Sequence, residues 1–386
     1  MYYTNTCFIK GGIVLAVTKQ HEYYEKRLEE LLIEMPYFVE KYVDDKLDIR
    51  SPLTLFNYVR DFKEFFEWLM AEQIVECDSI KSFPPESLET LSLNDANNYF
   101  KHLSRKKYKV SQKDGETKQI DAKTVNRKKS SLRSLFKYLT VEAEIATGKP
   151  YFERNVMAKI PIKKVSETFN ERSKKITEKI FVDDMDIHFL EFVQNDYEYL
   201  LSPAQKRYFR RDKERDFAIL SLFLGSGVRV NELSNLRLKD VDFTNKEISV
   251  IRKGGKKDTV SVTPSSLDVL ASYLDVRKNI YKAGDGDNEY VFVKVYNGKT
   301  APLTNRAIEN IVYKYTKAFD KRMSPHKLRH TYATNLAEQT GGDIPLIMNQ
   351  LGHTNSDISL LYINTTRKKQ RMAAEKMDQR RSRKSR

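Results

Sequence analysis

A change of residue pattern near position 160 constrains the fold of this chain more than any other feature. Residues 21–156 repeat apolar side chains at the spacing of amphipathic helices, whereas later residues mix helical and strand-like runs. The lysine-rich stretch between them has the polar character of a linker. With 386 residues, the chain is long enough to bury two cores. We therefore expect domains at 20–160 and 178–386, a linker at 161–177, and a leader of unclear status at 1–18.

The first domain is predicted to be entirely α-helical. Ser51 and Pro52 form a typical N-cap and first position for a long helix that ends near Glu72. A second helix begins at either Asp121 or Thr124 and runs to about residue 141.

The second domain is predicted to be mixed and mainly helical, with a small antiparallel sheet, so that the whole chain is α+β. Residues 216–224 form a buried helical run, and residues 325–362 form a series of short helices. Residues 246–262 alternate around Lys253-Gly-Gly-Lys256, which is typical of a β-hairpin.

The charge of the chain favours an anionic partner. Its 68 Lys and Arg exceed its 53 Asp and Glu, which leaves a net charge of +15. Such an excess suits nucleic acid or an anionic membrane surface. No apolar run approaches the ~20 residues that a membrane-spanning helix needs. Cys7 and Cys77 are too few and too far apart for a disulfide framework. We expect a cytoplasmic protein that does not use a membrane.

One predicted helix is strongly basic, since only positive charges occur between Lys123 and Lys137. Such a face is either a solvated surface or a contact with phosphates. The candidate DNA-binding residues are taken from this helix and from the hairpin: Lys123, Arg127, Lys128, Arg133, Lys256 and Lys257.

Several common phosphate and metal motifs are missing from the sequence. Gly225-Ser-Gly227 begins like a dinucleotide loop but lacks the third glycine. The sequence has no carboxylate cluster of the kind that holds two magnesium ions. Phosphate chemistry in this chain would therefore have to proceed without metal.

A set of motifs in the second domain carries such chemistry. His326-Lys-Leu-Arg329-His330 is followed by Leu351-Gly-His353, and Tyr362 comes nine residues after His353. Gly227-Val-Arg229-Val-Asn-Glu232 lies well upstream. Each motif alone could be structural, but the ordered set is hard to explain by packing.

These residue types fit attack on a phosphodiester. The five-coordinate transition state carries extra negative charge, and two guanidiniums, Arg229 and Arg329, can stabilise its oxygens. His326 lies on the same helical face as Arg329 and can donate to the phosphate or take a proton from the nucleophile. Tyr362 can form a covalent phosphate ester.

Two further residues complete the predicted site. Lys253, at the hairpin tip, can protonate the leaving 5′ oxygen. Glu232, three residues after Arg229, can hold one of the cationic groups in position.

The motif set strongly resembles the tyrosine recombinase (phage integrase-like) family. The family pattern carries over onto Arg229 with Glu232, Lys253, His326 with Arg329, His353, and Tyr362. Within the family, residues 150–157, 213–219 and 252–256 resemble the XerS type of the Xer branch. Family position favours Lys253 as the acting lysine over Lys256 and Lys257. The helical half resembles the core-binding domain of the family.

The resemblance implies a site-specific recombinase that cuts and rejoins DNA through a 3′-phosphotyrosine. It also implies a homotetramer on two DNA sites that requires no cofactor, neither metal nor ATP. Its task would be chromosome dimer resolution or mobile-element integration and excision. The alternatives are a type IB-like topoisomerase and a catalytically silent, integrase-derived DNA-binding protein. The basic C-terminal tail, residues 363–386, is either a disordered tail that binds DNA nonspecifically or, as the resemblance implies, contains a helix at 368–377 that docks on a neighbouring subunit through Met372, Ala373 and Met377.

Overall fold

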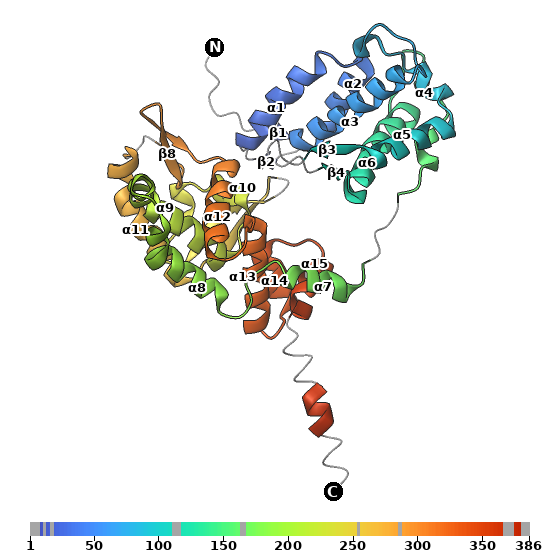
Figure 1. The fold of residues 1–386 in the computed structure, drawn as a ribbon. Coiled ribbons are helices and arrows are strands. Elements are labelled where there is room, and N and C mark those ends of the chain that lie inside the picture. The colour runs from blue at the N-terminus through green and yellow to red at the C-terminus, as the bar shows by residue number, and fades with distance from the viewer. Residues whose placement is uncertain are drawn as a thin grey trace. The chain divides into compact units, whose positions relative to one another are not determined.

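The computed structural model describes residues 8–10, 13–15, 19–109, 117–162, 167–252, 255–284, 288–365 and 374–379. The chain divides into two compact units (Figure 1). The first unit is Val17–Ser166, and the second unit is Glu167–Arg386 together with Met1–Ala16. The division therefore falls inside the segment 161–177 that the sequence marks as a linker.

The first unit is built from helices, as predicted, with one short hairpin in addition. Its α-helices are α1 (Lys19–Leu32), α2 (Tyr37–Lys46), α3 (Pro52–Ala71), α4 (Glu86–Thr90), α5 (Leu93–Arg105) and α6 (Ala122–Lys137). The hairpin pairs β3 (Lys107–Lys109) with β4 (Thr117–Gln119) in antiparallel register.

Local capping explains where the two predicted long helices begin. The Ser51 hydroxyl accepts from the backbone N–H of Thr54 at 3.3 Å, so α3 begins at the predicted position. Asp121, not Thr124, is the cap of α6, because its carboxylate accepts from the backbone N–H of Thr124 at 2.6 Å. The aromatic core under α3 includes Phe62 and Phe65, both fully buried.

The second unit is mixed and mainly helical, which confirms the predicted α+β class. Its α-helices are α7 (Phe169–Thr177), α8 (Met185–Glu191), α9 (Pro203–Ser226), α10 (Val230–Ser234), α11 (Pro264–Tyr281), α12 (Asn305–Phe319), α13 (Pro325–Gln339), α14 (Ile344–Leu351) and α15 (Ser356–Thr365).

Its strands form small antiparallel sheets. The predicted hairpin is confirmed, since β6 (Glu247–Ile251) pairs with β7 (Lys257–Ser261), and β5 (Val241–Asp242) joins the other edge of β6. A second pair joins β8 (Val293–Tyr296) to β9 (Lys299–Pro302). Near the start of the chain, β1 (Phe8–Lys10) pairs with β2 (Ile13–Leu15).

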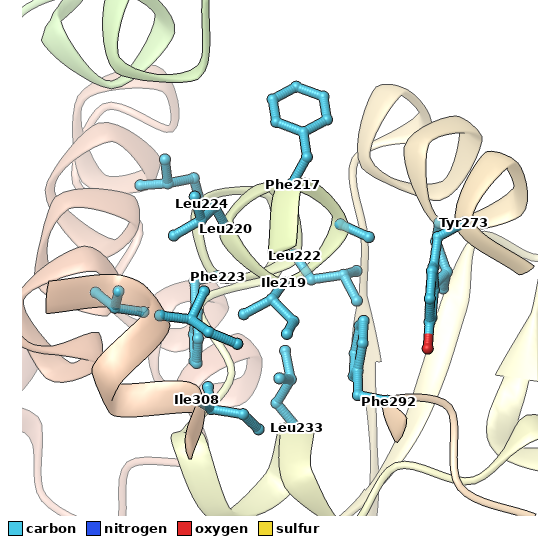
Figure 2. Packing of buried hydrophobic residues seen from close by; sticks show 14 of the residues in the cluster. Phe217, Ile219, Leu220, Leu222, Phe223, Leu224, Leu233, Tyr273, Phe292 and Ile308 are labelled. Carbon is cyan, nitrogen blue, oxygen red and sulfur yellow. The ribbon is translucent and has the colours of Figure 1, made fainter. Parts of the chain in front are cut away.

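The C-terminal half of α9 lies at the centre of the core of the second unit (Figure 2). Its residues from Phe217 to Leu224 are almost all apolar, so the helix can be buried on every side. Tyr273 of α11, Ile308 of α12 and Leu233 of α10 pack in the same cluster. This core fixes the end of α9, from which the loop to Arg229 departs.

The second half of the segment expected to be a linker, 161–177, is helical, since α7 occupies residues 169–177. The Thr168 hydroxyl accepts from the Glu171 N–H at 3.2 Å, and the Glu171 carboxylate accepts from the Thr168 N–H at 2.9 Å. This reciprocal capping box starts the helix. The pattern Thr-x-x-Glu was visible in the sequence, and α7 packs against α15, the helix that carries Tyr362.

Candidate active site

Tyr362 is buried in a small apolar cluster formed by three consecutive helices. It is 1% exposed and packs with Ala333 and Ala337 of α13 and with Ile347 and Leu351 of α14. Burial raises the pKa of its hydroxyl to about 12, although the charges of Arg329 and Arg229 oppose the shift. The phenol is therefore protonated in the free protein at neutral pH.

The Tyr362 hydroxyl has a specific polar partner in this apolar cluster. It lies 2.7 Å from Nδ1 of His330, which is itself 8% exposed. Burial, together with the nearby His326 and cationic side chains, lowers the pKa of His330 to about 3. A neutral imidazole accepts through one nitrogen, so His330 is an acceptor for the phenol proton when its Nδ1 is unprotonated.

Arg329 is hydrogen-bonded to backbone carbonyls, and its Nη1 also lies 3.9 Å from the carboxylate of Glu232. It is 1% exposed, and its guanidinium donates to the carbonyl of Gly227 at 2.5 Å and to the carbonyl of Leu351. Its Nη2 also lies 3.4 Å from Nε2 of His353. Burial and the positive charge of Arg229 lower the pKa of Arg329 to about 10, so the side chain remains cationic at neutral pH.

Arg229 reaches the same turn from a different part of the chain. Its Nη1 donates to Glu232 at 2.8 Å, and its Nη2 donates to the carbonyl of Gly352 at 3.3 Å. The side chain is 36% exposed, so it is accessible to a ligand. The two predicted arginines, Arg229 and Arg329, thus meet at the turn after α14, where they donate to the carbonyls of the neighbouring residues Gly352 and Leu351.

The loop to Arg229 depends on a glycine. Gly227 ends α9 with a φ of +67°, a conformation that favours glycine. A Cβ at this position would lie 2.4 Å from the ring of Tyr332. Tyr332, which is partly buried, therefore packs directly on the backbone that positions Arg229.

The two other predicted histidines lie next to these groups. His353 Nδ1 is 3.0 Å from the Ser359 hydroxyl, and the His353 ring stacks on Tyr362 with centroids 6.1 Å apart. Burial and the charge of Arg329 lower the pKa of His353 to about 4. His326 is exposed, and its ring centroid is 4.2 Å from that of His330, one turn along α13.

Glu232 is buried and binds two arginines. Its carboxylate accepts from the backbone and side chain of Arg229 and from Nη1 of Arg252, the latter at 3.1 Å to both oxygens. The positive charges and hydrogen bonds hold the pKa of Glu232 below its usual value, although burial opposes them. A carboxylate at this position can fix the orientation of Arg229, as the sequence predicted for it.

Comparison with known proteins decides the family. A model described as the Phage integrase family matches residues 191–369. Tyrosine recombinase XerS of Streptococcus agalactiae serotype III (strain NEM316) is 38% identical over 355 residues, which cover 91% of this chain and 98% of that protein. XerS of Streptococcus pyogenes serotype M5 (strain Manfredo) is 39% identical with the same coverage. The chain belongs to the tyrosine recombinase family.

A solved structure shares the fold of this recombinase. The crystal structure of XerH site-specific recombinase bound to palindromic difH substrate, a post-cleavage complex, matches with a TM-score of 0.63. The match covers 92% of this chain and 89% of that chain at 18% identity. The predicted family and fold are therefore confirmed.

The structure separates the DNA-binding candidates of the recombinase. In the second unit, Lys256 and Lys257 are exposed beside the β6–β7 turn, and Lys257 Nζ is 3.7 Å from Asp240. In the first unit, Lys123 is exposed, whereas Arg127 is half-exposed and makes a two-pronged ion pair with the buried Asp61. Lys253 lies outside the described residues.

Two candidates on α6 do not occupy the positions expected of phosphate contacts. Lys128 is 8% exposed and its ammonium is paired with Asp61, at 3.0 Å, and with Glu64. Arg133 donates to the carbonyls of Met157, at 3.1 Å, and of Ile160. Its guanidinium therefore provides hydrogen-bond donors for backbone carbonyls near the C-terminal end of the first unit. Both cations stabilise the first unit.

Two site residues were not identified from the sequence. His330 was named only as the last residue of the His326–His330 motif, and its partner proves to be the hydroxyl of Tyr362. His330 follows His326 by four residues, which places both rings on one face of the helix. This spacing could have indicated that His330 belongs to the site. Arg252 was noted only as a neighbour of Lys253, and no sequence signal pointed to its contact with Glu232.

The described part of the chain contains neither a membrane helix nor a metal cluster. None of its helices combines the length and the apolar character needed to cross a bilayer. Within those same ranges, no group of three or more His, Cys, Asp or Glu is placed to hold a metal ion.

The predicted docking helix of the tail is only partly covered. Residues 374–379 are helical, and Met377 is 55% exposed. Met372 and Ala373 lie outside the described residues.

Proposed function

We propose that this recombinase cuts and rejoins a specific DNA site through a covalent bond between the Tyr362 hydroxyl oxygen and a 3′ phosphate. The observation that carries the proposal is the linked set of contacts around the turn 351–353. There Arg229 donates to the carbonyl of Gly352, and Arg329 donates to the carbonyl of Leu351 and lies 3.4 Å from Nε2 of His353. The ring of Tyr362 stacks on His353.

The two guanidiniums supply the charge that the reaction requires. As Tyr362 attacks, negative charge grows on the non-bridging oxygens, and Arg229 and Arg329 are fixed in advance by backbone carbonyls. The neutral imidazoles of His326 and His353 can donate further hydrogen bonds to those oxygens. Preorganised donors of this kind need no rearrangement when charge develops.

Proton transfer to and from the reacting oxygens is assigned to two side chains. The Nδ1 of His330 lies 2.7 Å from the Tyr362 hydroxyl and can accept its proton as the oxygen–phosphorus bond forms. Lys253, which directly follows Arg252 in the hairpin, protonates the leaving 5′ oxygen. The bond between phosphorus and that 5′ oxygen breaks, which leaves a free 5′ hydroxyl.

Religation reverses these steps on the partner strand. A 5′ hydroxyl from the second duplex attacks the phosphotyrosine and releases Tyr362. Because the ester stores the energy of the broken bond, the exchange needs neither ATP nor a metal ion. Two duplexes and two strands per duplex imply four subunits, each of which cuts one strand.

The cellular role is proposed from the family resemblance. The relatives named tyrosine recombinase XerS support recombination, and we propose that its use is either chromosome dimer resolution or mobile-element integration and excision. Both place the recombinase on double-stranded DNA in the cytoplasm. Exposed Lys123, Lys256 and Lys257, together with Arg127, are the proposed contacts with the DNA backbone.

Trapping the covalent intermediate tests the proposal. In a DNA site with a nick next to the cleavage position, cleavage releases the short fragment that carries the free 5′ hydroxyl. Religation is then impossible, so the adduct accumulates and survives denaturing electrophoresis. We expect the adduct with the wild-type protein and with the Tyr313→Phe control, and none with Tyr362→Phe. An adduct with Tyr362→Phe would assign the nucleophile to another residue. A two-site assay that yields relaxed but never recombined DNA would instead indicate a topoisomerase.

A further inference from the structure

The turn after α14 presents three consecutive backbone carbonyls to three arginines. The carbonyls of residues 350, 351 and 352 accept, in that order, from Nη2 of Arg252, Arg329 and Arg229, the first at 2.9 Å and the last at 3.3 Å. Because peptide units have fixed dimensions, the turn sets the spacing of the guanidiniums that it holds. Two of them, Arg229 and Arg329, are the proposed phosphate ligands.

The C-terminal end of α9 is bonded to this turn. The last carbonyls of an α-helix have no partner within the helix and need donors from elsewhere. The carbonyl of Gly227 accepts from Nη1 of Arg329 at 2.5 Å, so Arg329 bridges the helix end and residue 351. The preceding residue, Ser226, is fully buried, and its carbonyl accepts from Nε2 of Gln350 at 3.0 Å. Arg329 and Gln350 therefore link the same two segments.

The side-chain amide of Gln350 is fully engaged with backbone groups. Besides its bond to Ser226, its nitrogen donates to the carbonyl of Ser261 in β7 at 2.8 Å, and its oxygen accepts from the N–H of Ser261 at 3.3 Å. A glutamine amide has two N–H groups, and both are used here. Gln350 thus crosslinks α9, β7 and the turn.

The two links differ in charge and in availability. Arg329 is a cation that can also bind phosphate, whereas Gln350 is neutral and its amide is occupied by the backbone. Without Gln350, the buried carbonyl of Ser226 would lose this donor and pay for its own desolvation. The helix end and the turn could then separate. The carbonyls that orient Arg229 and Arg329 would move with them.

We infer that Gln350 is a positioning residue that ties the turn 350–352 to the end of α9 and thereby sets where Arg229 and Arg329 present their guanidiniums. The inference rests on the proposed function, in which both guanidiniums stabilise the phosphate under attack. Loss of Gln350 should then impair the stabilisation of charge on the phosphate, in addition to any effect on the amount of folded protein.

Two substrates separate these effects. One is the nicked site with an ordinary phosphodiester, and the other carries a methylphosphonate at the cleavage position, in both configurations at phosphorus. The methyl group replaces a non-bridging oxygen, so the transition state carries one negative charge fewer and depends less on guanidiniums. A loss of folded protein, in contrast, lowers the rates on both substrates by the same factor.

The rate of adduct formation is measured on both substrates for the wild type, Gln350→Met, Gln350→Asn and Arg229→Ala. Methionine keeps the length of the side chain but removes the amide. Asparagine keeps the amide but is one methylene shorter, so it cannot reach both backbone carbonyls. Each rate is divided by that of the wild type on the same substrate, and a thermal melt of each protein sets a temperature at which it is folded.

We expect both Gln350 variants to lose about tenfold to 10²-fold on the phosphodiester, since a misplacement of about 1 Å can cost on the order of 10²-fold. On the methylphosphonate they should lose about threefold or less. Arg229→Ala should show the same selectivity with a larger loss on the phosphodiester. Gln339→Met is the matched control, because it exchanges an exposed glutamine at the end of α13 in the same unit. It should leave both rates unchanged.

The outcomes distinguish the inference from the proposed function. Equal losses of the Gln350 variants on the two substrates, or no loss on either, overturn the inference and leave the proposed function standing. If Arg229→Ala loses equally on both substrates, the assignment of its guanidinium to the phosphate fails, and the inference fails with it. A wild-type protein that forms no adduct on the phosphodiester contradicts the proposed function itself.

A variant that does not fold also gives a result. If Gln350→Met is unfolded in the melt, Gln350→Asn decides by the same comparison of substrates. If neither variant is folded at any temperature, Gln350 serves the fold as a whole, and the inference is overturned.

Discussion

Tyr362→Phe should destabilise the second unit as well as abolish cleavage. The substitution removes only one hydroxyl from the side chain. The structure shows that this hydroxyl is bonded at 2.7 Å to Nδ1 of His330 and that the two residues are 1% and 8% exposed. Phenylalanine would leave this buried nitrogen without its partner.

The expected cost follows from the burial of both groups. A buried polar group that loses its hydrogen-bond partner costs about 1–3 kcal/mol. For a unit of this size, each kcal/mol lowers the melting temperature by roughly 2–4 °C. We therefore expect Tyr362→Phe to melt about 2–12 °C below the wild type in the absence of DNA.

A double-mutant cycle with His330→Leu isolates the contact. Thermal unfolding of the wild type, both single variants and the double variant is followed by circular dichroism at pH 8, where His330 is neutral. The double variant should be more stable than the sum of the single effects predicts, by about 1 kcal/mol or more. Additive effects, or a Tyr362→Phe variant as stable as the wild type, would refute the reasoning. DNA affinity of Tyr362→Phe should be measured well below its melting temperature.

Four further results are expected. The pKa of His330 is about 3 in the folded protein against an ordinary 6.5, so the unfolded chain takes up the proton first as the pH falls. The free energy of unfolding should therefore decrease below pH 6.5, by roughly 2 kcal/mol at pH 5. Denaturant melts at pH 5 and 8 check this, and equal stability contradicts it. Arg329→Lys should lose about 10²–10³ in adduct formation and also melt lower, since a lysine cannot reach both backbone carbonyls; near-normal cleavage would reduce Arg329 to a general anchor. Lys128→Ala should destabilise the first unit by on the order of 2–4 kcal/mol. Lys123→Ala should leave the melting temperature unchanged and lower the salt dependence of DNA binding by about one unit of slope. The reverse pattern would indicate that Lys128 contacts DNA, as the sequence predicted. Deletion of residues 368–386 should spare binding to a single site but impair recombination between two sites, and normal recombination at low salt would exclude the docking helix.

The catalytic residues were predictable because residues a few positions apart in a helix or turn remain close together in the folded protein. His326 and Arg329 lie three residues apart on α13. Tyr362, on α15, follows His353 by only nine residues, so the two residues must lie near each other in the fold. The partner of Tyr362 was not predictable in the same way. The contact with His330 depends on how α15 packs against α13, which no local pattern encodes.

The buried position of Lys128 on α6 had a signal in the sequence. Lys128 falls at the helical spacing of the buried Val125, Leu132 and Leu135, so its position already lay on the apolar stripe. Asp61 lies on the buried face of α3 in the same way, next to Phe62. A charged residue on the apolar stripe of a helix indicates a buried ion pair, whereas counting lysines along the segment indicates only net charge.

The way in which Arg329 is held has a consequence for sequence drift and redesign. Its orienting acceptors are the main-chain carbonyls of residues 227 and 351. No exchange of side chains at residue 351 removes its acceptor, provided that the packing there survives, whereas residue 227 must also remain glycine. Insertion or deletion of a single residue beside 227 or 351 would shift a carbonyl by the length of a peptide unit. Both turns are therefore sensitive to loop length, and grafts between relatives should keep both turns at their native length.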